Sequence, residues 1–432
     1  MPSRVLSATL VGIDGVIVEV EADVAPGLPV CNLVGLPDAA VKEARDRVRA
    51  AIVNSGIAFP RTRVTVNLAP ADLRKEGPAF DVPIAGAILF AAGRVECTRE
   101  DGTDGDAHDV VPADARTLCV GELGLDGSIR SVTGILPIVL ACQRLGMTTI
   151  ILPAGNAEEA SAVGGITILP ARRLLDVVQH FVGQQRIEPY ARVPRSDERA
   201  TDGDPHDLAL IHGLGTAKRA LEIAAAGGHN LLFIGPPGSG KSLLARALPT
   251  ILPTMMEREA LEVTMVHSVV GLVPTGGGLM RTRPFRAPHH SASDTALIGG
   301  GSVPRPGEVS LAHRGVLFLD ELPEFGRSVL ECLRQPLEDG VVTVSRIAGT
   351  VTFPARFQLL AAMNPCPCGY WHDAQRSCTC PPGQVLKYQR RISGPLLDRI
   401  DLVVDVPRQP TETLLSAPRA ESSVEVRPRV DA

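Results

Sequence analysis

Hydrophobic and polar residues follow two different periods along the first part of the chain, which indicates a mixture of strands and helices. Residues 15–24 and 63–70 alternate apolar with polar side chains, as half-buried strands do. Residues 37–56 instead repeat apolar side chains every three or four positions, with Asp38 at the expected start and a glycine at the expected stop. Residues 134–153 show the helical period and then, after a glycine turn, the strand TTIILP. This part of the chain is therefore predicted to be an α/β domain.

The later part of the chain carries three short apolar runs that predict buried strands. They are NLLFI before a glycine-rich loop, GVLFLDEL at residues 315–322 and FQLLAAMN at residues 357–364. Between the last two runs, residues 341–357 contain two β-rich stretches with a short turn at 347–349, which predicts a hairpin. Strands and helices alternate here too, so a second α/β domain is expected.

Segments without apolar periodicity divide the chain. Residues 97–115 are expected to form an acidic surface loop, residues 183–207 an interdomain linker, and residues 406–432 a tail. The two domains predicted from these breaks cover residues 1–182 and 208–405.

Composition and charge restrict the class of protein. The 432 residues are 44% hydrophobic and 21% charged, which is typical of a globular protein. No apolar run approaches the roughly 18 residues of a membrane span, and residues 1–15 lack the basic start and apolar core of a signal peptide. We therefore expect a cytoplasmic protein with no membrane partner. Because the net charge is −5, any contact with nucleic acid has to come from local clusters of arginine or lysine.

The glycine-rich loop has the spacing of a phosphate-binding loop between a strand and a helix. Its residues are Gly235, Pro236, Pro237, Gly238, Ser239, Gly240, Lys241 and Ser242. Backbone amides of such a loop surround the β-phosphate of a nucleotide, Lys241 reaches the β and γ oxygens, and Ser242 is placed to ligate Mg²⁺. ATP and Mg²⁺ are therefore the expected cofactors.

Polar residues follow the next two predicted strands. Asp320 ends the strand in GVLFLDEL and is expected to hold the Mg²⁺ shell, while Glu321 orients or deprotonates the attacking water. Asn364 ends FQLLAAMN, where its amide can touch the γ-phosphate or that water. These residues favour ATP hydrolysis over ATP binding alone.

Four of the nine cysteines lie in one loop, residues 365–381, as two C-x-C pairs. They are Cys366, Cys368, Cys378 and Cys380. Four thiolates can hold one tetrahedral Zn²⁺, and His372 can replace one of them. The alternative is a reduced, thiol-rich loop without metal. Because the loop is too polar and too rich in turn residues to form a core by itself, we expect a structural zinc site that fixes Asn364.

The phosphate-binding loop, the acidic pair and the polar residue after the third strand together resemble the AAA+ ATPases. A late arginine, Arg399 in RRISGPLLDRIDL, completes the resemblance. In that superfamily such an arginine acts as a finger in the site of a neighbouring subunit, which implies a ring. Outside that superfamily, Arg399 would be read as a salt-bridge partner.

Longer motifs resemble the Mg-chelatase-like competence family, ComM or YifB. They are KRALEIAAAGGHNLLFIGPPGSGKS, RPFRAPHHSASDTALIGGG, PGEVSLAHRGVLFLDELPEF, LRQPLEDGVVTVSR, NPCPCGY and SGPLLDRIDL. The resemblance implies a hexameric, ATP-driven DNA helicase that promotes branch migration during transformation and recombination. The alternative is a chaperone-like ATPase subunit of a metal chelatase, which shares the AAA+ core. Relatives continue into a helical lid, and residues 406–432 resemble only its beginning, so most of the lid is expected to be missing.

The N-terminal region resembles the proteolytic domain of Lon-type proteases. The resemblance covers RKEGPAFDVPIAGAIL and GELGLDGSIRSVTGILPIVLACQRLGMTTIILPAGN. Ala79 and Leu136 occupy the positions of Lon's nucleophilic serine and its lysine, and neither side chain can attack a carbonyl or accept a proton. A scaffold or substrate-docking module is therefore expected rather than a peptidase.

The predicted hairpin resembles the one that MCM-type AAA+ helicases project into their central channel, with Arg346 near its tip. Six copies of Arg346 in a ring would place positive charge where a DNA strand passes. Phosphate contacts of this kind are non-specific and weaken with salt. Arg281, Arg283 and Arg286 form a competing basic cluster.

Overall fold

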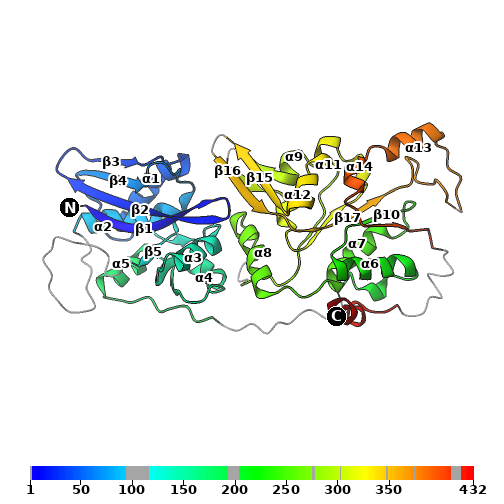
Figure 1. The fold of residues 1–432 in the computed structure, drawn as a ribbon. Coiled ribbons are helices and arrows are strands. Elements are labelled where there is room, and N and C mark those ends of the chain that lie inside the picture. Colours follow the sequence, from blue (N-terminus) through cyan, green and yellow to red (C-terminus); the bar gives the residue numbers. More distant parts are fainter. Residues whose placement is uncertain are drawn as a thin grey trace. The chain divides into compact units, whose positions relative to one another are not determined.

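The computed structural model describes residues 2–93, 116–192, 204–274, 278–301, 303–346, 349–373, 375–409 and 420–432. The chain forms two units, one comprising Met1–Pro194 with His267–Leu279 and the other Arg195–Val266 with Met280–Ala432 (Figure 1). All of the predicted acidic loop, the middle of the predicted linker and residues 410–419 of the predicted tail lie outside the described residues. Among the residues that are described, no helix is both long enough and apolar enough to cross a membrane.

The first unit is built on a seven-stranded sheet with the order β3-β4-β2-β1-β5-β8-β9. Its strands are β1 Ser3–Val11, β2 Asp14–Ala25, β3 Val30–Val34, β4 Arg63–Ala69, β5 Thr117–Cys119, β8 Thr149–Pro153 and β9 Thr167–Ala171. β2 pairs antiparallel with β1 and β4, and the other neighbours pair in parallel. A short hairpin of β6 Glu122–Leu123 and β7 Ile129–Arg130 lies outside this sheet.

Helices cover both faces of this sheet. They are α1 Ala39–Asn54, α2 Asp81–Ala91, α3 Ile135–Arg144, α4 Ala157–Ala160 and α5 Leu174–Val182, with 3-10 turns η1 Pro78–Phe80 and η2 Ala154–Asn156. α1 begins where the sequence predicts, because the Asp38 carboxylate accepts a hydrogen bond from the Val41 amide at 2.7 Å. Buried residues of α1, α2 and α5 share one core with the sheet. α3 packs against the other face of β2, at Gly15, where a Cβ would lie 2.8 Å from the Pro137 oxygen.

His267–Leu279 belongs to the first unit although it lies within the second in sequence, which sequence reasoning did not anticipate. The Gly134 amide donates to the Ser268 carbonyl oxygen at 2.9 Å, and the Ser268 hydroxyl donates to the Glu159 carboxylate. These contacts flank Leu136, which is fully buried in α3. Leu136, whose position resembles that of Lon's lysine in sequence, is therefore part of the packed interior.

The second unit is built on a five-stranded parallel sheet with the order β11-β14-β17-β10-β18. Its strands are β10 Leu231–Ile234, β11 Phe285–Arg286, β14 Val316–Leu319, β17 Gln358–Met363 and β18 Leu402–Asp405. Three of these, β10, β14 and β17, are the buried strands that the apolar runs predict. Because all five strands are parallel, their carboxyl ends meet at one edge of the sheet and their amino ends at the opposite edge. We call these the carboxyl edge and the amino edge.

Short helices surround this sheet. They are η3 Leu208–Leu210, α6 Gly215–Gly227, α7 Lys241–Ile251, α8 Glu257–Val269, α9 Asp294–Ile298, α10 Glu308–Leu311, η4 Leu322–Glu324, α11 Arg327–Glu331, α12 Arg334–Asp339, α13 Pro382–Gln389, α14 Gly394–Leu397 and α16 Ser423–Asp431. β12 Gly299–Gly300 and β13 Arg305–Pro306 pair antiparallel as a two-stranded ribbon. α16 packs against α6 and α7, with Val426 and Val430 in the core that they share.

The hairpin expected at residues 341–357 is present. β15 Val341–Arg346 and β16 Gly349–Pro354 pair antiparallel, with Arg346 opposite Gly349. The two residues between them lie outside the described part of the chain. The backbone of Arg346 is thus at the end of the hairpin, as the sequence predicts.

Candidate nucleotide site

The glycine-rich loop follows β10 directly, and its backbone requires glycine at particular points. A Cβ at Gly235 would lie 2.1 Å from the carbonyl oxygen of Val406, because the chain after β18 passes very close to the loop. Gly238 and Gly240 have φ values of 76° and 97°, in the left-handed region that favours glycine. α7 then begins at Lys241, so the loop lies at the amino end of a helix at the carboxyl edge of the sheet.

Lys241 lies at the centre of this loop, with only 8% of the residue exposed. Its Nζ donates to the carbonyl oxygens of Gly235 at 2.7 Å and Pro236 at 2.9 Å, and to Oδ1 of Asn364 at 3.3 Å. Burial lowers the pKa of Lys241, while the carboxylates of Asp320 and Glu321 act in the opposite direction. The three acceptors hold the ammonium group at the mouth of the loop, next to the end of β17.

Ser242 and Asp320 form the second part of the site. The Ser242 hydroxyl donates to Oδ2 of Asp320 at 2.8 Å, and Oδ1 of Asp320 accepts from the Glu321 amide at 2.9 Å. Adjacent ligands of an octahedral Mg²⁺ are about 2.9 Å apart, given metal–oxygen distances of about 2.0–2.1 Å. The separation of the two oxygens therefore suits a shared Mg²⁺ ion.

Glu321 has a partner that sequence reasoning missed. Oε2 of Glu321 lies 3.1 Å from Nδ1 of His290, and the Glu321 backbone is left-handed, with a φ of 54°. His290 follows β11, the strand next to β14, so the sheet itself brings the two side chains together. Its ring packs against that of His289, with centroids 4.1 Å apart and the planes tilted by 34°, whereas Nδ1 of His289 faces the Ser291 hydroxyl at 2.8 Å. The motif FRAPHHS marked this segment, but nothing in its spacing pointed to Glu321.

Arg399 does not join the other predicted site residues. The Asn230 side-chain amide donates to the Arg399 carbonyl oxygen at 2.8 Å, just before β10 begins, so Arg399 lies at the amino edge. A strand of four residues is about 13 Å long, and the whole strand separates Arg399 from the loop that follows β10. Its guanidinium forms an ion pair with Glu338 of α12. Arg399 therefore has a salt-bridge partner within its own chain and lies far from the candidate nucleotide site of that chain.

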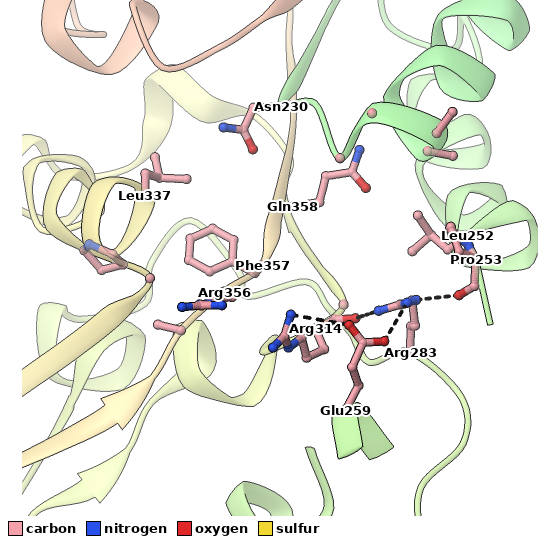
Figure 2. Close-up of a pocket in the computed structure, with 18 of the residues that line it drawn as sticks. Asn230, Leu252, Pro253, Glu259, Arg283, Arg314, Leu337, Arg356, Phe357 and Gln358 are labelled. Atoms are coloured by element: carbon pink, nitrogen blue, oxygen red, sulfur yellow. Dashed lines mark hydrogen bonds and ion pairs between the residues drawn. The ribbon is translucent and has the colours of Figure 1, made fainter. Parts of the chain in front are cut away.

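A cleft of about 690 Å³ also opens at the amino edge (Figure 2). Glu259 bridges two arginines there, with 3.1 Å to Arg283 Nη2 and 3.3 Å to Arg314 Nη1. Arg283 also donates to the carbonyl oxygens of Pro253 and Arg314. The cleft is thus at the edge opposite the glycine-rich loop and is not part of the candidate nucleotide site.

The four clustered cysteines converge as their spacing predicts. The Sγ atoms of Cys366, Cys368 and Cys378 are 3.3–3.6 Å apart, and all four sulfur atoms, with that of Cys380, lie within 4.8 Å of one another. Hydrogen bonds from backbone amides, that of Thr379 first, lower the pKa of Cys368 to about 6. Such a group of thiols can supply the ligands of a metal ion.

The cysteine loop packs directly on the glycine-rich loop. Gly369 has a φ of 84°, and a Cβ there would lie 2.6 Å from Cδ of Pro237. Arg408 donates to the Pro237 carbonyl oxygen at 3.3 Å. The conformation of the cysteine loop therefore affects the position of Pro237, through the contact with Gly369.

The competing basic cluster is largely engaged in ion pairs. Both Nε and Nη2 of Arg286 donate to Glu308, at 2.6 and 2.7 Å, and Arg283 is held by Glu259. These two arginines are therefore poorly placed to bind phosphate. The expectation for Arg346 stays a prediction.

Comparisons with known proteins cover both units. The profile of the family described as "Magnesium chelatase, subunit ChlI" matches residues 207–414, and that of "Subunit ChlI of Mg-chelatase" matches residues 20–156. The competence protein ComM of Haemophilus influenzae is 45% identical over 99% of this chain and 81% of its own length. YifB of Escherichia coli is 43% identical over 100% of this chain and 81% of its own length. The magnesium-chelatase 38 kDa subunit of Rhodobacter capsulatus is 28% identical over 40% of this chain and 55% of its own length.

Proposed function

Because this chain belongs to the Mg-chelatase-like AAA+ family that includes ComM and YifB, we propose that it is an ATP-hydrolysing DNA motor. It acts in the cytoplasm as a ring of identical subunits and promotes branch migration. The observation that carries ATP hydrolysis is the convergence of Lys241, Ser242, Asp320 and Asn364 at the carboxyl edge of one parallel sheet. Ligands of parallel α/β sheets bind at this edge.

Each of these residues has a defined part in the proposed reaction. Lys241 exchanges its contacts with Gly235, Pro236 and Asn364 for the β and γ phosphate oxygens of ATP. Ser242 and Asp320 would hold Mg²⁺, which neutralises charge on those oxygens. Glu321 orients the attacking water and accepts its proton, and the Asn364 amide fixes that water or the γ-phosphate. Phosphoryl transfer depends mainly on such positioning and charge compensation.

The place of Arg399 supports a ring. An arginine at the amino edge cannot reach the nucleotide of its own chain, but it can reach a nucleotide at the carboxyl edge of a neighbour. In the ring, Arg399 would leave Glu338 and act as a finger on the neighbour's γ-phosphate. A homohexamer is the assembly that we propose.

Zinc is the metal that we propose for the cysteine cluster. Zn–S distances of about 2.3 Å place the sulfur atoms of a tetrahedral site about 3.8 Å apart. The distances of 3.3–3.6 Å among three of the thiols are close to this value. The ion would be structural, since four thiolates leave no open position, and its role would be to hold the loop that packs on Pro237.

Branch migration of a three-stranded DNA substrate tests the proposal. Purified protein with ATP and Mg²⁺ should move the junction, and Glu321→Gln, which is expected to bind ATP but to hydrolyse it about 10² to 10³ times more slowly, should not. Junction movement that is the same with and without ATP would contradict a motor. ATP turnover with no effect on the junction would favour the chelatase-type alternative.

A further inference from the structure

A groove of about 920 Å³ lies in the second unit between α13 and the segment that follows Glu321. One wall is η4 with the start of α11, which includes Glu324 and Arg327. The other is α13 with the turn after it, which carries Lys387, Arg390 and Arg391. The groove thus begins only a few residues beyond the proposed catalytic glutamate.

The groove is strongly basic. Glu324 is the acidic residue of its lining, and that carboxylate forms an ion pair with Arg391 at 2.8 Å. Within the described residues, the exposed side chains of Lys387 and Arg390 have no hydrogen bond and no ion pair. Arg327 is also exposed, and its positive charge is one of the causes that lower the pKa of nearby Glu331. A net positive charge of about three therefore faces the groove in a protein whose overall charge is −5.

The fold of α13 fixes the direction of these cations. Val385 and Tyr388 are buried, at 4% and 5% exposure, and anchor one face of the helix. Leu386, Lys387 and Arg390 are exposed, and residues three to four positions apart lie on the same side of a helix. Leu386 adds an exposed apolar surface beside the two charges. The helix itself follows the cysteine cluster, so the same loop that would hold zinc also positions this face.

We propose that this groove binds the phosphate backbone of single-stranded DNA. The inference rests on the proposed function and names a contact for the DNA that such a motor moves. Arg283 and Arg286 are held by glutamates, whereas the groove offers cations that no acidic group neutralises. Unpaired basic side chains along a groove can follow the phosphate backbone of a single strand.

The groove also has a direct link to the hydrolytic site. Nη1 of Arg391 donates to the carbonyl oxygen of Pro323 at 3.2 Å, in the turn that Glu321 begins. A DNA strand bound along α13 would therefore act, through Arg391, on the turn that carries the proposed catalytic carboxylate. An acidic protein segment could fill the groove, but a DNA motor needs a structural connection between its DNA-binding surface and its ATPase site, and Arg391 provides one.

The test compares two double variants that lose the same formal charge. Lys387→Ala with Arg390→Ala empties the groove of its unpaired cations, and Lys42→Ala with Arg61→Ala removes two exposed cations of the first unit. Binding of a labelled oligothymidylate of about 30 nucleotides is measured by fluorescence anisotropy over a range of salt concentrations. Binding of a fluorescent ATP analogue is measured in parallel.

The groove variant should lose two phosphate contacts, each worth about 0.7 in the slope of log K against log salt concentration. The slope should become shallower by about 1.4, and affinity for the oligonucleotide near 0.1 M salt should fall roughly 25-fold. Affinity for the ATP analogue should not change, and the control variant should behave like the unsubstituted protein.

Four results would overturn the inference. Unchanged DNA affinity in the groove variant would show that the groove does not bind DNA, and an acidic protein partner would become the better candidate. An equal loss in the control would show a general charge effect, and an equal loss of ATP affinity would assign the groove to the nucleotide site. If the unsubstituted protein bound no DNA at all, the proposed DNA motor would fail, and the groove proposal with it.

Discussion

Replacing Cys366 and Cys368 by serine should abolish zinc binding and loosen the loop that supports the nucleotide site. The four thiols close a loop of 15 residues, from Cys366 to Cys380. A cross-link that closes a loop of this length is worth about 3 kcal/mol in chain entropy, and a metal clip acts in the same way. Opening of the loop should therefore become roughly 150-fold more frequent in the variant.

Two assays read this change independently. Metal analysis of protein purified without chelator should find about one zinc per chain in the unsubstituted protein and almost none in the variant. Hydrogen exchange should show amides between residues 366 and 380 losing about two orders of magnitude of protection. Because Gly369 touches Pro237, ATP affinity should fall as well.

Cys332→Ser is the matched control, since Cys332 is a partly buried thiol outside the cluster. It should retain both zinc and protection. Absence of zinc from the unsubstituted protein, or full retention of zinc by the double variant, would refute the metal site. Loss of zinc without any change in exchange would refute the argument that the ion orders the loop.

Three further predictions concern the ATPase site. Glu321→Gln should bind ATP normally and lower kcat by a factor of about 10² to 10³, as single-turnover kinetics would show, and an unaltered kcat would remove Glu321 as the base. His290→Ala should lower kcat about tenfold without raising KM, because the Glu321 carboxylate loses its partner. His290→Gln should recover part of this loss, and His289→Ala should leave kcat unchanged, so equal effects of the two alanine variants would exclude a positioning role. Arg399→Ala should be inactive alone, yet turnover should return when it is mixed with inactive Lys241→Ala subunits. The Arg399→Ala subunits supply an intact nucleotide site, and the Lys241→Ala subunits supply the arginine. A mixture that stays inactive would argue against a finger that acts between subunits.

Local sequence patterns were sufficient to bring the residues of the candidate nucleotide site together, because each of them closely follows a strand. Lys241, Asp320 and Asn364 each come just after an apolar run, and the carboxyl ends of parallel strands meet at one edge. The convergence of the cysteines was predictable for a similar reason, since the four thiols lie within one short loop. Contacts within such segments depend on spacing that can be read from the chain.

Contacts between distant segments could not be predicted in this way. The pair of His290 and Glu321 exists because β11 and β14 are neighbours, an order that no local pattern specifies. The contact between Gly369 and Pro237 and the docking of His267–Leu279 in the first unit likewise join segments far apart in sequence. Composition marked Arg283 and Arg286 as a basic cluster, but only the structure reveals that glutamates neutralise them.

ATP hydrolysis by the purified protein, measured with and without single-stranded or branched DNA, tests the central claim most directly. If the chain is a DNA motor, DNA should raise kcat by about tenfold or more, and raised salt should weaken the stimulation because phosphate contacts carry it. Lys241→Ala should abolish both the basal and the stimulated rate. ATP turnover that does not respond to DNA under any of these conditions would contradict the account.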